Sequence, residues 1–273
     1  MKLKTVSASY SKLLEQLKRE GTSFFSTQDV LKLLPDLSYG AVREMLRKMV
    51  NKGLLLRIEG GLYNVIPFEQ DSSTYFPNWH QVAAALATPN EYYIGFYSAL
   101  HIHSLITQPS LVEQVVTKKQ ILPKKREIKN VRFEFITFNE DHFFGFKKHW
   151  IDDYNQVYCS DLEKTIIDSL YKPDYSGGIT EIVKAIYKRK DQVDLKKMEG
   201  YLERFNAQVV YKRLGFISEK LNIWADLREN IKSKITNSYS PLDSSIPKKG
   251  MHNSTWRIID NLDIKTVISS TQT

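Results

Sequence analysis

The amino-acid sequence predicts an α+β protein with two domains, and three observations support this prediction. The first 67 residues hold helical apolar patterns followed by a short hairpin pattern. The next stretch, residues 68–77, is polar and ends in a proline, which is typical of a linker. Residues 78–273 mix short strand patterns with helical ones, and their second half is mainly helical. We therefore expect an N-terminal domain over 1–67, a linker over 68–77 and a larger mixed α/β domain over 78–273.

The charge of the chain is concentrated at its N-terminal end. The formal net charge of the 273 residues is +8, and residues 1–66 alone hold 11 basic and 6 acidic side chains, a net charge of +5. A basic terminal domain indicates a polyanionic partner, with nucleic acid first and a membrane surface second. Hydrophobic residues make up 42% of the chain and charged residues 26%, which is an ordinary composition for a globular protein.

The sequence also suggests where the protein works. Its single cysteine, Cys159, excludes an intrachain disulfide, which suits a reducing compartment. We see no signal-peptide pattern at the N-terminus and no apolar run near the roughly 20 residues that span a bilayer. We therefore expect a cytoplasmic protein without a membrane partner.

Two helices are predicted at the start of the chain. The first covers Ser7 to Glu20, where apolar residues recur at spacings of three and four, and Gly21 ends it. Phe24 and Phe25 are expected to pack beneath it. A second helix starts at Ser26 and is stopped by Pro35.

The stretch from Leu37 to Val65 then combines a helix with a hairpin. Ser38 is a suitable N-cap, the helix has one apolar and one basic face, and Gly53 suits its C-terminal cap. Two short strand patterns follow, joined by Gly60-Gly61. Two helices joined by a short turn, followed by a basic-edged hairpin, predict a winged helix-turn-helix domain. The alternative is a helix with a solvated charged face beside an ordinary hairpin.

If this third helix binds DNA, its exposed face supplies the contacts. The helix spans about 24 Å at 1.5 Å per residue, whereas the major groove is about 12 Å wide, so only its N-terminal half meets base edges. The candidates for base contacts are Ser38, Tyr39, Arg43 and Arg47. Lys48, Lys52 and Arg57 are expected to contact phosphates, which positions the protein without reading the sequence.

The larger domain begins with a helix over Asn78–Ala87, a strand over Tyr92–Gly95 and a buried helix over Phe96–Leu105. Further strands are predicted over Val112–Thr117, Val131–Thr137 and Val157–Cys159. The spacing of Ser160 and Glu163 predicts a capping box for a helix over 161–171. Helical patterns cover 179–232 with breaks near residues 191, 206 and 222, and a final strand is expected over 255–259.

The segment from Lys118 to Arg132 holds seven basic residues and one acidic residue. It is either a solvated loop or a second nucleic-acid contact.

An enzymatic site is not apparent in the sequence. Asp161, Glu163 and Asp168 share one predicted helix, where the first two favour the positive helix start instead of forming a convergent acid set. His101 and His103 diverge on a helix, so they do not chelate one metal ion together. We find no zinc spacing and no phosphate-binding glycine loop. We therefore expect no catalytic residues, no metal and no cofactor.

Four blocks of the chain resemble the AbiEi family of antitoxins from bacterial type IV toxin–antitoxin pairs. The first is the N-terminal helical region ending in GGLYNVIP, which is a generic pattern. The other three are YYIGFYSALHIHSL, VYCSDLEKTIIDSLYKPDYSGGITEIVKAI and SPLDSSIPKKGMHNSTWRIIDN. The third and fourth blocks are the specific ones. Together the four blocks extend over nearly the whole chain.

The resemblance implies a function for each domain. It implies that the N-terminal domain binds double-stranded operator DNA and represses the antitoxin–toxin operon. It implies that the C-terminal domain is an antitoxin domain that counteracts a nucleotidyltransferase-like toxin, without a stable complex, in a phage-defence system. The C-terminal half is less basic than a second DNA-binding surface requires. An enzyme that acts on nucleic acid, and is targeted by the winged helix, is the alternative function.

Overall fold

The computed structural model describes residues 6–106, 108, 110–262 and 264–269, and it is a mixed α+β structure. The backbone contacts divide the chain into two compact units. The N-terminal unit is the chain up to Thr88 together with Glu127–Val131, and the C-terminal unit comprises Pro89–Arg126 and the chain from Arg132 onward.

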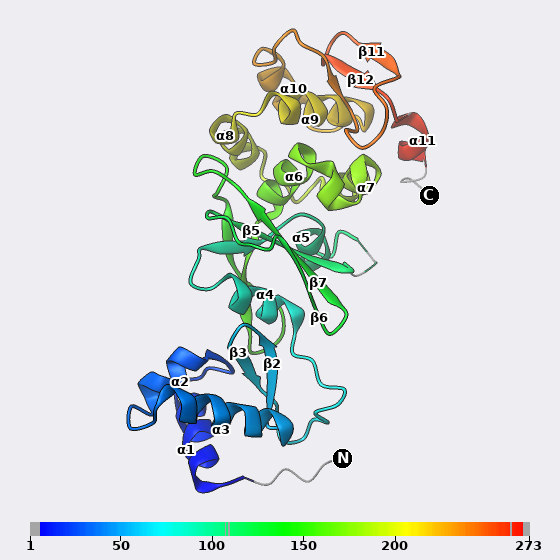
Figure 1. The fold of residues 1–273 in the computed structure, drawn as a ribbon. Helices are drawn as coiled ribbons and strands as arrows, with labels where there is room; N and C mark the ends of the chain where they lie inside the picture. The colour runs from blue at the N-terminus through cyan, green and yellow to red at the C-terminus, as the bar shows by residue number, and fades with distance from the viewer. Residues whose placement is uncertain (1–5, 107, 109, 263, 270–273) are drawn as a thin grey trace. The chain divides into compact units, whose positions relative to one another are not determined.

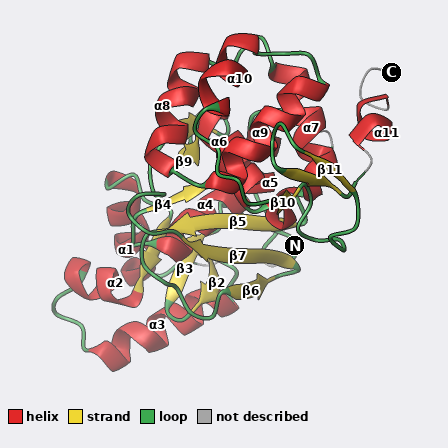
Figure 2. Ribbon diagram, turned by 90° about the horizontal axis from the view of Figure 1, so that it is seen from above, coloured by secondary structure: helices red, strands yellow, loops and turns green. Residues whose placement is uncertain are grey.

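The N-terminal unit combines helices with a small antiparallel sheet (Figures 1 and 2). Its sheet has the strand order β1-β3-β2. The predicted helices and hairpin are present, whereas β1 was not expected from the sequence. The elements are α1 (Ala8–Arg19), β1 (Phe24–Ser26), α2 (Thr27–Leu33), α3 (Tyr39–Asn51), β2 (Leu55–Glu59), β3 (Leu62–Val65) and α4 (Trp79–Ala87).

One apolar cluster holds this unit together. Leu13 and Leu17 of α1 pack in it with Val30 of α2 and with the buried face of α3. Each fully buried aliphatic side chain contributes roughly 1.5–3 kcal/mol to the free energy of unfolding. Because α3 places one whole face in this cluster, its opposite face is held outward.

The predicted linker packs on the N-terminal unit. The Tyr75 hydroxyl donates to Oδ1 of Asn64 at 3.1 Å. Lys129, from the turn after β6, donates to the carbonyl oxygen of Tyr75 at 3.2 Å. These bonds explain why the division between units falls after Thr88, beyond the expected segment 68–77.

The C-terminal unit has a mixed sheet with the order β6-β7-β5-β4-β9-β8. In this sheet β5 runs parallel to β7 and β4 parallel to β9, while the β4–β5 and β8–β9 pairs are antiparallel. Its strands and first helix are β4 (Tyr92–Ile94), α5 (Phe96–Ile102), β5 (Val112–Thr117), β6 (Lys125–Ile128), β7 (Val131–Thr137), β8 (Phe146–Trp150) and β9 (Gln156–Ser160).

Helices cover the sheet, and a small second sheet follows them along the chain. α6 and α7 lie between strands β5 and β7 and the helices α9 and α10 (Figure 1). The small sheet has the order β10-β12-β11. These elements are α6 (Leu162–Tyr171), the 3₁₀ turn η1 (Pro173–Ser176), α7 (Gly178–Arg189), α8 (Leu195–Phe205), α9 (Gln208–Lys220), α10 (Ala225–Lys232), β10 (Ser240–Pro241), β11 (Met251–Asn253), β12 (Ile258–Asp260) and α11 (Ile264–Ser269).

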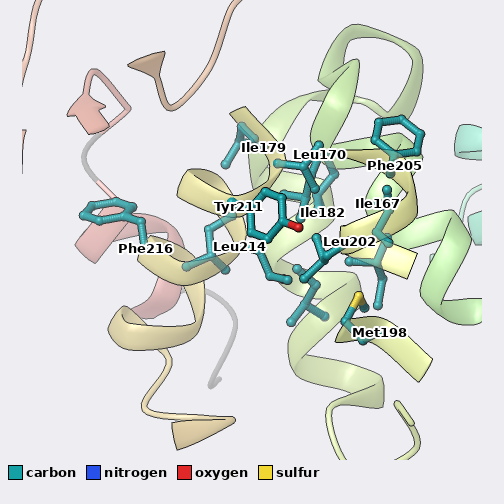
Figure 3. Packing of buried hydrophobic residues seen from close by; sticks show 14 of the residues in the cluster. Ile167, Leu170, Ile179, Ile182, Met198, Leu202, Phe205, Tyr211, Leu214 and Phe216 are labelled. Carbon is teal, nitrogen blue, oxygen red and sulfur yellow. The ribbon is translucent and has the colours of Figure 1, made fainter. Parts of the chain in front are cut away.

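The helical half of this unit encloses its main apolar core (Figure 3). Side chains of α6 to α9 meet there, including Ile167, Ile182, Leu202 and Leu214, each at most 1% exposed. Trp256, which precedes β12, is also buried, and its Nε1 donates to Oε2 of Glu219 at 2.8 Å. A side chain at position 215 would overlap with the indole ring of Trp256. Glycine at this position of α9 therefore leaves the space into which Trp256, beside the small sheet, packs.

Several local predictions differ from the structure. The final strand, expected over 255–259, is β12 at Ile258–Asp260. The capping box at Ser160 and Glu163 is wrong, because Asp161 caps α6 and its Oδ1 accepts the amide of Lys164 at 3.0 Å. The basic segment 118–132 contains strand β6, so it is not all loop. Strand β8, with the sequence FKKHW, was not predicted, since its polar edge position hides the apolar alternation on which strand prediction depends.

Candidate nucleic-acid interface

Helix α3 presents the surface on which the predicted binding residues lie. Ser38 caps the helix, and its Oγ accepts the amide of Ala41 at 3.3 Å. Val42, Leu46 and Met49 are fully buried in the unit core. Gly53 follows the helix with φ +70°, a backbone conformation that suits glycine. The two ends and the buried face therefore fix which side chains point to solvent.

A hollow of about 800 Å³ opens along this exposed surface. Three parts of the N-terminal unit border it: helix α3, the start of α2 and the β2–β3 hairpin. Its lining comprises Ser26, Thr27, Gln28, Tyr39, Gly40, Arg43, Glu44, Arg47, Val50, Asn51, Arg57, Gly60, Gly61 and Tyr63.

The structure brings some of the predicted contact residues together in this hollow and leaves others outside it. Four of them border the hollow, namely Tyr39, Arg43, Arg47 and Arg57. Lys48 is exposed on α3 beside Glu44, at 3.6 Å from Oε1. Lys52 lies over the ring of Tyr10 at 5.3 Å from its centroid, so its ammonium is directed to the unit itself.

An acidic residue that we did not consider from the sequence lies in the middle of the basic surface. Glu44 accepts two bonds from Arg47, Nε to Oε2 at 2.8 Å and Nη2 to Oε1 at 2.7 Å. The hydrogen bond from Arg47 lowers the pKa of Glu44 to about 2. At neutral pH the carboxylate is therefore ionised and occupies the planar face with which Arg47 would bind an anion.

Arg43 is the least encumbered arginine of the helix. Its guanidinium carbon lies 5.8 Å from the centroid of the Tyr39 ring. No carboxylate pairs with it within the described part of the chain. Arg57 is exposed on β2 and reaches the same hollow from the hairpin. Arg43 and Arg57 thus offer two positive charges to one ligand.

Sequence reasoning missed several polar groups of this surface. Gln28 is exposed in the first turn of α2, and Asn51 is exposed in the last turn of α3. The turn at Gly60 and Gly61 brings backbone to the hollow, where the Gly61 carbonyl accepts the amide of Thr27 at 3.0 Å. The position of Gln28, two residues after the Ser26 cap and in the first turn of α2, was the available signal.

The acids of α6 do not form an exposed catalytic set. Asp168 is fully buried, where its carboxylate pairs with the ammonium of Lys164 and accepts the Tyr93 hydroxyl at 2.9 Å. The spacing of Lys164 and Asp168 by four residues was visible in the sequence, whereas their burial was not.

Two lysines of the basic segment 118–132 form ion pairs within the protein. Lys118 pairs with Glu140 at 2.7 Å, and Lys125 pairs with Glu134 at 3.2 Å.

Comparisons with known proteins relate this fold to a solved structure. The chain matches no protein-family model, and no curated protein sequence matches it. The crystal structure of the RV2827C protein from Mycobacterium tuberculosis is similar, with a TM-score of 0.72 and 11% sequence identity. The alignment covers 100% of this chain and 97% of that chain. The likeness shows a shared fold.

Over the described residues, we find no helix with the length and apolar character that crossing a membrane requires.

Proposed function

We propose that the N-terminal unit is a winged helix-turn-helix domain that binds double-stranded operator DNA. The observation that carries the proposal is the hollow beside α3, where Arg43, Arg47 and Arg57 meet from a helix and a hairpin. A phosphate backbone attracts such a group of cations, and an arginine on an exposed helix has the geometry to bind a guanine edge. The concentration of positive charge in residues 1–66 supports the same partner.

In this proposal the N-terminal turns of α3 enter the major groove. The helix has 13 residues, or about 20 Å at 1.5 Å per residue, and is longer than the groove is wide. Arg43 then contacts base edges, with Ser38 and Tyr39 beside it. Arg57 contacts phosphate from the hairpin, and Lys48 contacts it from the far end of α3. Lys52, expected from the sequence to contact phosphate, lies over the Tyr10 ring and is left out of this interface. Arg47 binds DNA after it leaves Glu44.

We further propose that the protein is a cytoplasmic antitoxin of a type IV toxin–antitoxin system, which represses its own operon. The C-terminal unit would counteract a nucleotidyltransferase-like toxin without a stable complex. Three of the four sequence blocks that resemble AbiEi antitoxins lie in this unit, in β4–α5, in β9–α6–α7 and in β10–β12. The resemblance of these blocks supports the proposal, and the blocks include buried residues of the unit.

The test uses the DNA upstream of the protein's own gene. Fluorescence anisotropy with this duplex and a scrambled duplex at matched salt should show tighter binding to the upstream duplex. Arg57→Ala should weaken binding to both duplexes alike. Lys12→Ala, which removes one positive charge from the exposed face of α1, is the control. Equal, weak binding of both duplexes by the wild type would contradict an operator function.

A second test addresses the antitoxin activity. Co-expression with the product of a neighbouring nucleotidyltransferase-like gene should restore growth that this gene alone prevents. A chain with Arg43→Ala should still restore growth while it loses repression of a reporter, because the two activities are proposed for different units. Loss of both activities in a normally folded Arg43→Ala variant would contradict this separation.

A further inference from the structure

The C-terminal unit contains a polar cavity of its own, with a volume of about 420 Å³. Its walls come from the end of α5, from β8, from the start of α6, from the end of α7 and from α8. This volume lies in the range of roughly 300–1,000 Å³ that is usual for small-ligand sites. The cavity is independent of α3 and of the DNA-binding proposal.

The acidic groups of this cavity are already satisfied by the protein. Asp161 and Glu163 line it, and Lys197 binds both, at 3.0 Å and 2.7 Å. The other bonds to the two carboxylates are those from the Tyr201 hydroxyl at 2.9 Å, from the amide of Lys164 at 3.0 Å and from the amide of Asp194 at 2.9 Å. All four carboxylate oxygens thus accept protein donors, so the acids are not arranged to receive a cationic ligand.

Two cations of the cavity have no such carboxylate. Arg189 donates from Nη1 to Oε1 of Gln192 at 2.9 Å and from Nη2 to the carbonyl oxygen of His103 at 3.5 Å. These neutral acceptors orient the guanidinium and leave its charge uncompensated. Lys147 is exposed on β8, and among the described residues no carboxylate pairs with it.

Two imidazoles complete the lining. The rings of His103 and His149 lie edge to face with centroids 5.5 Å apart. Nε2 of His103 lies 2.7 Å from the carbonyl oxygen of Ser160. A carbonyl oxygen only accepts hydrogen bonds, so Nε2 is the donor, and Nδ1 of His103 is an acceptor in the neutral ring. Burial lowers the pKa of both histidines, which favours the neutral form of each ring. The His149 ring nitrogens have no hydrogen-bond partner among the described residues, which leaves one donor and one acceptor for a ligand.

We propose that this cavity binds a phosphate ester that also carries a hydroxyl group. The phosphate lies between Lys147 and Arg189, and the neutral imidazoles bind its ester and hydroxyl oxygens. Charge-assisted hydrogen bonds from arginine to phosphate are short and strong, and its planar group matches two phosphate oxygens. A metal ion is a poorer occupant, since no group of three His, Cys, Asp or Glu side chains in the described part of the chain is placed to hold one. A mononucleotide and the 5′ end of an RNA both carry a phosphate ester beside hydroxyl groups, and the experiment below distinguishes these two sources.

The histidines provide the readout for a direct test. We would record proton–carbon NMR spectra of the full chain labelled at histidine Cε1 and titrate it with inorganic phosphate, with sodium chloride at matched ionic strength as the control. The resonances of His103 and His149 should move in a saturable way, while those of His142 and His252 should stay in place. His103→Gln and His149→Gln assign the two signals.

Substitutions then locate the phosphate. Lys147→Ala and Arg189→Ala should each weaken phosphate binding about tenfold, the loss expected for one charged hydrogen bond. Arg189→Lys should bind phosphate more tightly than Arg189→Ala, because it keeps the positive charge at this position. Lys148→Ala is the matched control, because Lys148 is the exposed neighbour of Lys147 on β8 and does not line the cavity.

The source of the phosphate is distinguished by comparing AMP, adenosine and a short RNA with or without a 5′ phosphate. Displacement by AMP equal to that by the phosphorylated RNA assigns a mononucleotide, and preference for the phosphorylated RNA assigns an RNA end. The proposal is overturned if phosphate moves neither His103 nor His149. It is also overturned if Lys147→Ala and Lys148→Ala have the same effect, since the phosphate would then be bound by surface charge alone.

Discussion

Lys164 is a lysine without access to solvent, and its environment explains how the core tolerates it. Its ammonium pairs with Asp168 and also contacts the hydroxyl of Tyr93 at 3.0 Å. Phe138, Phe144 and Phe205 lie with ring centroids 5.1 Å from Nζ, so aromatic faces surround the charge. The pair is thus a structural feature of the C-terminal unit.

Removal of one partner from this pair should be costly. Asp168→Asn or Lys164→Met should lower the free energy of unfolding by about 3–5 kcal/mol, because each leaves an uncompensated buried charge. The double substitution Lys164→Met with Asp168→Leu should recover much of this loss. Urea unfolding followed by circular dichroism measures all three variants. Single variants as stable as the wild type would show that the pair carries no charge.

Arg43 is the residue that we expect to read the operator. Arg43→Ala should reduce operator affinity by about 1–3 kcal/mol, the range for one bidentate base contact, and should reduce binding to unrelated DNA less. Arg43→Lys should be a poor replacement, since an ammonium lacks the planar donor pair. Anisotropy titrations on operator and scrambled duplexes give both values. Equal losses on the two duplexes would make Arg43 a phosphate contact.

At the scale of one helix, we expect the pair between Glu44 and Arg47 to limit how strongly α3 attracts DNA. Glu44→Gln removes a negative charge and releases Arg47, so we expect binding to any duplex to strengthen roughly two- to fivefold, the scale of an exposed ion pair. The log–log slope of affinity against salt should steepen by about 0.9 if Arg47 then binds one further phosphate. Anisotropy titrations at several salt concentrations measure both effects. Glu15→Gln on α1 removes the same charge elsewhere and serves as the control, and an equal gain from both variants would refute a specific role for the pair.

The elements show what the sequence predicts and where it fails. The 3.6-residue period predicted α3 and, with breaks near residues 191, 206 and 222, the series from α7 to α10, since most of these helices bury one face against a core. The edge strand β8 was missed because a strand exposed at one edge lacks a full apolar alternation. The cap of α6 was misplaced by one residue, from Ser160 to Asp161, because spacing alone does not distinguish adjacent capping side chains.

The candidate binding surface was predictable in part. Tyr39, Arg43 and Arg47 followed from the helical period, because the buried face of α3 determines the opposite one. The meeting of Arg57 with this helix depends on how the hairpin folds back, which the sequence shows only as a turn signal. The pairing of Glu44 with Arg47, and the cavity around His103 and His149, depend on side-chain directions and on tertiary packing that no local pattern encodes.

At the scale of the whole molecule, the division into units predicts the behaviour of fragments. A chain that ends at Thr88 keeps the entire apolar cluster of the N-terminal unit and all of the proposed DNA contacts. It should unfold cooperatively and bind the operator somewhat more weakly, since it loses the bond from Lys129 to Tyr75. Calorimetry and anisotropy test this fragment, with its own Arg43→Ala variant as control. A fragment without a thermal transition would show that Glu127–Val131 is essential to the unit.

The fit between Gly215 and Trp256 has a consequence for the history of the sequence. The indole fills the space that a side chain on α9 would take, so the two positions, 41 residues apart, share a single volume. A substitution at one of them is tolerable only with a compensating change at the other. Among relatives of this chain, we therefore expect glycine at position 215 wherever a large ring stands at 256, and larger residues at 215 only together with small ones at 256.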